Sequence, residues 1–127
     1  MPVRPGDVFT PQAAPFHRYI ILTRPDADGN VLVANLTSIN ANNEDQGCRL
    51  EMSDYPSYIK NQTTVRFNKA DLYQASGIVE SHSLKINEPV PPDTLKKIQR
   101  CGSKSINLKK KYRKLLADEL GIALPEI

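Results

Sequence analysis

Apolar and polar positions alternate through the first forty residues in a pattern that predicts three short strands. Apolar residues gather at 8–9, at 19–22 and at 31–36, and a Pro-Gly-Asp turn at 5–7 precedes the first group. The polar segment 26–30 separates the last two groups, and its glycine readily takes the positive φ of a hairpin turn. We therefore expect a three-stranded antiparallel meander, in which the start of the second strand lies beside the end of the third.

Shorter periodic segments follow the meander. Residues 48–52 alternate weakly, and residues 63–67 alternate β-branched and aromatic side chains, so both segments predict strands. Residues 68–73 have the pattern of a single helical turn, and 77–86 that of one more strand or strand pair. The run 40–47 is too polar to bury and predicts a loop.

The last third of the chain is expected to be helical. Prolines in the segment 89–92 stop the sheet, because proline has no N–H to donate, and a helix follows as far as 101–103. A second, amphipathic helix is expected over 107–120, with Gly121 as its cap and with one apolar face, formed by Leu108, Tyr112, Leu115, Leu116 and Leu120.

This order of elements indicates a mainly β or α+β fold. With 127 residues and 39% hydrophobic content, the chain is long enough for one domain with one modest core. We expect residues 1–90 to form a small antiparallel barrel or strongly curved sheet, and residues 91–127 to form a helical segment packed on it.

Charge is distributed unevenly between these two parts. Residues 1–90 carry eight Lys and Arg against ten Asp and Glu, a net charge of −2, whereas residues 91–127 carry nine against four, a net charge of +5. Two interpretations of the basic segment are open. It can attract phosphate, or its lysines can simply keep an amphipathic helix soluble.

The composition also bears on location and on metal binding. No run approaches the roughly 18–20 apolar residues that cross a bilayer, and the first residues lack the charged-then-apolar pattern of a signal peptide, so we expect a cytoplasmic protein without membrane contact. Under those conditions Cys48 and Cys101 are expected to be two reduced thiols rather than a disulfide. Without clustered histidines they make no zinc site, and we expect neither a metal nor a cofactor.

Four polar residues stand where the second strand begins and the third ends, namely His17, Arg18, Thr37 and Ser38. An imidazole can transfer protons near neutral pH, a guanidinium can hold a phosphate through two hydrogen bonds, and hydroxyls can donate to the same group. The alternative is purely structural: the histidine lies at a strand edge, Arg18 pairs with Asp7, and the hydroxyls cap the next turn.

Lys60, Arg66, Tyr55 and Tyr58 extend this hypothesis to binding. The two cations flank the segment 61–64 and can continue a phosphate track, whereas the tyrosines can stack on unpaired bases, as aromatic residues do in proteins that hold single strands. The alternative is that the cations are merely solvated and the tyrosines are half-buried packing residues.

Several of these segments resemble the PemK/Kid/MazF-type toxins, which are small SH3-like barrels with sequence-selective ribonuclease activity in toxin–antitoxin systems. The resemblance rests on Pro5-Gly6-Asp7-Val8, on Arg-Tyr-Ile-Ile-Leu at 18–22, on Val-Ala-Asn-Leu-Thr-Ser at 33–38 and, more weakly, on 63–67. It implies an SH3-like antiparallel barrel with C-terminal helices, and metal-independent endoribonuclease activity on single-stranded RNA. It also implies an antitoxin protein and a homodimer as partners.

A second function remains open beside the nuclease. Family members usually have an Arg-Pro pair after a glycine-containing loop, whereas here Tyr19 follows Arg18 and the preceding loop differs. The alternative is a non-catalytic SH3-like module that binds nucleic acid or a protein partner.

Overall fold

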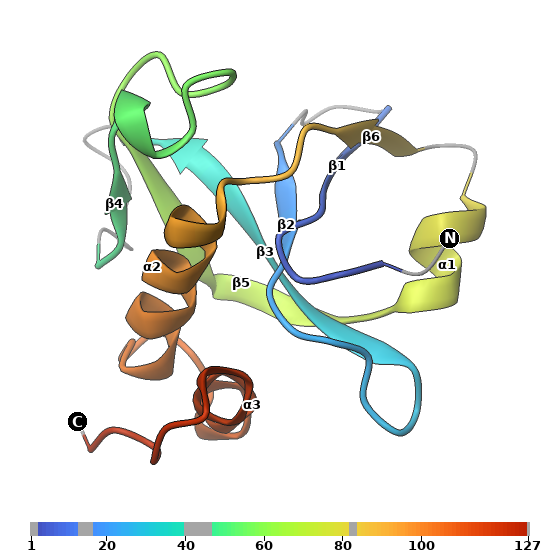
Figure 1. Ribbon diagram of the computed structural model, residues 1–127, viewed down its shortest axis with the longest axis vertical. Helices are drawn as coiled ribbons and strands as arrows, with labels where there is room; N and C mark the ends of the chain where they lie inside the picture. The colour runs from blue at the N-terminus through green and yellow to red at the C-terminus, as the bar shows by residue number, and fades with distance from the viewer. Residues whose placement is uncertain (1–2, 13–16, 40–46, 82–83, 127) are drawn as a thin grey trace.

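A computed structural model describes residues 3–12, 17–39, 47–81 and 84–126 (Figure 1). The expected loop at 40–47 lies, except for Gly47, outside these residues. The strands are β1 (Val8–Pro11), β2 (Tyr19–Ile21), β3 (Asn30–Ser38), β4 (Arg49–Leu50), β5 (Thr63–Gln74) and β6 (Leu84–Asn87). The helices are the short 3-10 helix η1 (Met52–Asp54) and the α-helices α1 (Ala75–Glu80), α2 (Pro92–Ser103) and α3 (Lys110–Leu120).

The described strands form one antiparallel sheet in the order β4-β5-β3-β2-β1-β6. The expected meander of β1, β2 and β3 is confirmed: Val8 lies opposite Ile20 in the first pair, and Tyr19 opposite Asn35 in the second. Between β2 and β3 the chain turns tightly at Gly29, whose φ of +80° is a conformation that favours glycine. The glycine N–H donates to the Asp26 carbonyl at 3.0 Å.

The fold is α+β, as expected, but the sheet is not closed into a barrel. The hydrogen-bonded order begins at β4 and ends at β6, and these two edge strands do not pair with each other among the described residues. β4 contributes only two residues, which pair with the first two residues of β5. β6 pairs along its whole length with β1. No described strand is left to join the two edges.

Two of the expected elements are wrong. Instead of making a helical turn at 68–73, the chain continues as β5, because Leu72 and Tyr73 pair with Leu32 and Val31 of β3. The polar residues that suggested the turn fall where the β3–β5 register shifts, at a β-bulge. Where a strand was expected from residue 77, the chain forms α1, which buries Ile78 against the sheet. The second part of that expectation is confirmed as β6.

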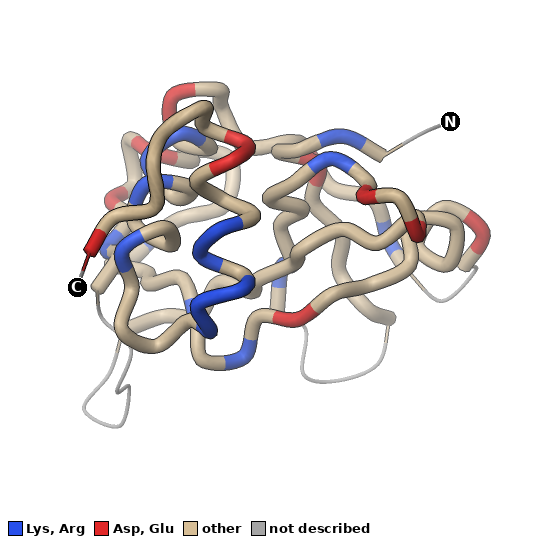
Figure 2. Tube along the Cα trace, turned by 90° about the horizontal axis from the view of Figure 1, so that it is seen from below, with Lys and Arg blue, Asp and Glu red and all other residues tan. Residues whose placement is uncertain are grey.

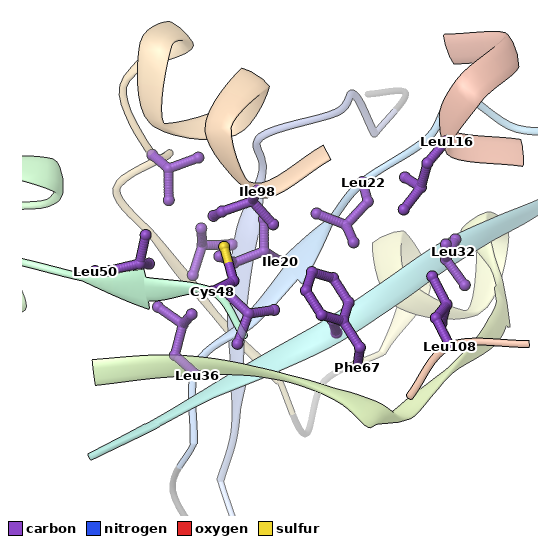
Figure 3. Close-up of a cluster of buried hydrophobic side chains, with 14 of the residues drawn as sticks. Ile20, Leu22, Leu32, Leu36, Cys48, Leu50, Phe67, Ile98, Leu108 and Leu116 are labelled. Carbon is purple, nitrogen blue, oxygen red and sulfur yellow. The ribbon is translucent and has the colours of Figure 1, made fainter. Parts of the chain in front are cut away.

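Apolar side chains from the two faces of the sheet form two separate clusters. The larger one, here called the main core, lies between the sheet and the helices α2 and α3 (Figure 3), and includes Ile20, Leu22, Leu36, Phe67, Ile98 and Leu116. The smaller one, here called the second cluster, lies on the opposite face and consists of Phe9, Ile21, Val31, Val33 and Ile78 with partly buried neighbours.

Helices α2 and α3 cover the main-core face (Figure 1). α3 begins at Lys110, three residues later than expected, and ends where Gly121 adopts a φ of +71°. The Tyr112 hydroxyl, on the apolar face of α3, donates to the Asp71 carboxylate of β5 at 2.9 Å, and burial together with this bond raises the pKa of Tyr112. Among the described residues, no helix has the length and apolar character needed to cross a membrane.

The expectation of two reduced thiols is wrong, because Cys48 and Cys101 form a disulfide. Their Cα atoms lie 5.6 Å apart although 53 residues separate them along the chain. The bond joins the residue before β4 to α2. The prediction of free thiols rests on the long sequence separation and on the expected cytoplasmic location. In the folded chain, α2 packs near β4, and this packing brings the two sulfurs together at the main core.

Candidate functional site

The alternation of β2 divides the expected site residues between the two faces of the sheet. Ile20 lies in the main core, whereas Tyr19 and Ile21 contact the second cluster. Arg18 follows the same alternation, since its side chain contacts Tyr55 of the main core. Successive side chains of an extended chain point to opposite faces, so His17 lies on the face of the second cluster.

The third strand divides its polar residues in the same way. Leu36 lies in the main core and Val33 in the second cluster, which places Thr37 on the second-cluster face and Ser38 on the other. The Leu36 N–H donates to the Arg18 carbonyl at 2.9 Å, so the β2–β3 ladder extends one step beyond β2. If this register is extended one position beyond that hydrogen bond, His17 falls across from Thr37 on one face, while Arg18 and Ser38 belong to the opposite face.

Arg18 is held by two tyrosines on the main-core side. Its Nη1 donates to the Tyr55 hydroxyl at 2.8 Å, and its guanidinium carbon lies 4.2 Å from the centre of the Tyr58 ring. The Tyr55 hydroxyl in turn donates to the Glu88 carbonyl. Burial raises the pKa of Tyr55, against the opposing effect of the Arg18 charge. These contacts tie the start of β2 to the segment after η1 and to the segment before α2.

This arrangement answers two of the alternatives left open by the sequence. Arg18 does not pair with Asp7, whose carboxylate instead accepts a hydrogen bond from the Arg4 N–H at 2.8 Å. The ring of Tyr55 is 1% exposed and offers no surface on which a base could stack. The guanidinium of Arg18 occupies one face of Tyr58. Arg18 and the two tyrosines, expected in separate roles, thus form one packed cluster.

The second-cluster face carries a different group of polar residues, here called the polar face. Thr37 lies opposite Thr64, and Thr64 opposite Arg49, so a row crosses β3, β5 and β4 beside His17. In the next row Tyr19, Asn35 and Arg66 lie opposite one another across β2, β3 and β5. The polar face therefore consists of His17, Asn35, Thr37, Arg49, Thr64 and Arg66.

Burial differs among these side chains. Arg49 is exposed, and His17, Thr37 and Arg66 are half-buried. The Thr64 hydroxyl is buried and donates to the Cys48 carbonyl at 3.3 Å. Asn35 is 4% exposed, and no described residue forms a hydrogen bond with its side chain. A buried amide normally has a partner, so Asn35, which lies opposite Arg66, has unused hydrogen-bonding capacity toward the described residues.

Arg49 is the residue of this face that the sequence interpretation missed. The pattern of 48–52 already predicted a strand, but only the β4–β5 register shows that Arg49 lies beside Thr64. Lys60, by contrast, lies on the exposed segment before β5 and outside these rows. No group of three His, Cys, Asp or Glu side chains that could hold a metal occurs within the described ranges.

The polar face has the components of a phosphate site: two guanidinium groups as anion ligands, a threonine hydroxyl and an amide as hydrogen-bond donors, and an imidazole that can transfer a proton. Comparison with known proteins adds nothing to this chemistry, because no family model matches the chain and no curated protein is significantly similar to it.

Proposed function

We propose that this chain is a toxin-like endoribonuclease that cleaves single-stranded RNA on its polar face without a metal. The observation that supports this best is the strand register, in which Tyr19 lies opposite Asn35 and Asn35 opposite Arg66. Extended two positions beyond Tyr19, the same register sets His17 across from Thr37 on the face of Arg66. The resemblance to the PemK/Kid/MazF-type toxins supplies the reaction class.

The reaction needs a base for the 2′-hydroxyl, an acid for the leaving oxygen and positive charge around the phosphorus. In this proposal His17 accepts the proton of the 2′-hydroxyl while the 2′-oxygen bonds to phosphorus, the bond from phosphorus to the 5′-oxygen breaks, and the leaving oxygen takes a proton from water. Arg66 and Arg49 hold the phosphate oxygens. Thr37 donates a hydrogen bond to the same group. Arg18 becomes a positioning residue, since its bond to Tyr55 fixes the start of β2 beside His17. Ser38 has no part in the reaction.

The test is cleavage of a long RNA by the purified protein in the presence of EDTA. We expect cleavage by the wild type and a loss of about 100-fold or more in His17→Ala, the usual contribution of general acid–base catalysis. Arg66→Gln should also lose activity. Lys69→Gln is the matched control, because it removes an exposed cation from the same strand. Equal cleavage by the wild type and His17→Ala would contradict the proposal.

The same experiment separates the nuclease from the binding module. A folded wild type that binds the RNA and leaves it intact would favour a non-catalytic module. The resemblance also implies a homodimer and an antitoxin, and both remain predictions. A monomeric mass by light scattering at micromolar concentration would count against the homodimer.

A further inference from the structure

Three aromatic rings lie together on the second-cluster face, next to the polar face. Phe9 of β1 and Tyr19 of β2 are stacked, with ring centres 5.5 Å apart and an interplanar angle of 12°. Tyr73 of β5 meets both rings, at 6.2 Å from Phe9 and 6.4 Å from Tyr19. Phe9 is buried, whereas Tyr73 remains 38% exposed. The cluster therefore has a buried base and an accessible aromatic edge.

These rings line a pocket of about 270 Å³. Ile78 and Leu84 complete its apolar wall, and Gln74 and Ser81 bring polar groups to it. This volume is near the lower end of small-ligand pockets, which are mostly apolar with a few polar groups that fix orientation. A planar, largely apolar ligand with polar edges suits such a wall.

The pocket is next to the proposed phosphate site through Tyr19. This residue lies opposite Asn35, which lies opposite Arg66. It is also two positions from His17 along the same extended segment, a distance of about 7 Å. A phosphate held by His17 and Arg66 therefore places a neighbouring nucleotide beside the aromatic rings.

We propose that this pocket binds an unpaired nucleobase of the RNA next to the cleaved phosphate, with Tyr19 and Tyr73 as its stacking surface. Proteins commonly hold single strands through phosphate contacts combined with bases stacked on aromatic side chains. Gln74, at the edge of the pocket, is placed to read the hydrogen-bonding edge of the base. The inference rests on the proposed function, to which it adds a determinant of sequence preference.

The direct test follows the tyrosine ring protons by NMR while uridine or adenosine 5′-monophosphate is added. We expect the Tyr19 and Tyr73 resonances to shift with a nucleotide and not with inorganic phosphate. Tyr73→Leu should remove the response and weaken binding of a short single-stranded RNA roughly 5- to 150-fold, the range for loss of one stacked base. Tyr73→Phe, which keeps the ring, is the matched control and should retain both.

The outcomes separate this inference from the nuclease proposal. Ring shifts that Tyr73→Leu abolishes would support the pocket even if the protein cleaves no RNA, and only the nuclease would then fail. If RNA is cleaved but no nucleotide shifts the Tyr19 and Tyr73 rings, and Tyr73→Leu changes neither RNA affinity nor the cut sites, the pocket is overturned and the nuclease stands.

Discussion

Gly102 of α2 packs tightly against side chains of α3 and β5. A Cβ atom at this position would lie 2.4 Å from Leu116 Cδ1 and 2.9 Å from Phe67 Cε1. Both neighbouring side chains are buried in the main core, so neither can move aside without displacing others. The glycine is therefore required for helix α2 to pack at this depth.

We predict that Gly102→Ala destabilises the protein by about 1–3 kcal/mol, the usual cost of overpacking a core. The sign of the stability change is informative, because replacing glycine by alanine within a helix otherwise stabilises a protein by up to about 1 kcal/mol. Gly77→Ala in α1 is the control, since its Cβ would meet nothing closer than 4.0 Å. Urea denaturation measures both variants, and a Gly102→Ala protein as stable as the wild type would contradict the packing described here.

The sequence predicts which strand ends of the candidate site lie together, but not which of its residues share a face of the sheet. Hairpin geometry correctly placed the start of β2 beside the end of β3. It could not separate His17 from Arg18, because adjacent residues point to opposite faces and the sequence does not say which face carries chemistry. The partners Arg49 and Arg66 come from strands whose pairing depends on long-range register, which local patterns do not contain.

At the scale of the elements, the local sequence pattern correctly predicts the strands and helices that depend mainly on contacts between residues close in sequence. The meander and the two C-terminal helices follow from turn residues and from helical periodicity. β5 was predicted too short because its second half is polar, and it is extended by pairing with β3 rather than by propensity. α1 was missed for a related reason: its six residues carry a weak helical pattern and depend on the burial of Ile78.

The Cys48–Cys101 disulfide attaches the smallest strand of the sheet to α2. β4 has only two paired residues, so the covalent bond is a main attachment of the segment that carries Arg49. We predict that Cys48→Ala/Cys101→Ala lowers the free energy of unfolding by about 2–4 kcal/mol, because the lost crosslink closes a long loop.

Denaturation with and without a reductant measures this effect. The wild type should lose stability in dithiothreitol, whereas the double variant should show no response. Disulfides persist mainly in oxidising compartments. Alkylation of free thiols immediately after cell lysis would therefore show whether Cys48 and Cys101 are bonded inside the cells that produce the protein. A wild type equally stable in both conditions would contradict the assigned role of the bond.

At the scale of the whole molecule, the sheet separates two positively charged regions. Figure 2, which views the molecule from below, shows Lys and Arg grouped along α3. The lysines at 109–111 are exposed on the main-core side, where α3 packs. Arg49 and Arg66 belong to the polar face on the opposite side. Net charge alone therefore does not distinguish the polar face from α3 as the surface for the proposed RNA binding.

We predict that Arg49→Gln/Arg66→Gln weakens binding of single-stranded RNA and reduces its salt dependence. Each phosphate contact contributes about 0.7 to the slope of log affinity against log salt for single strands, so losing two should lower that slope by about 1.4. Lys109→Gln/Lys110→Gln/Lys111→Gln should leave the slope unchanged, because these residues belong to the segment that packs on the main-core side of the sheet. The free energy of unfolding of this triple variant should fall by no more than about 2 kcal/mol, through the lost contacts of Lys109 and Lys111 with the Tyr112 ring. Fluorescence anisotropy at several salt concentrations compares the two variants, and a reduced slope in the lysine variant would instead place the RNA backbone along α3.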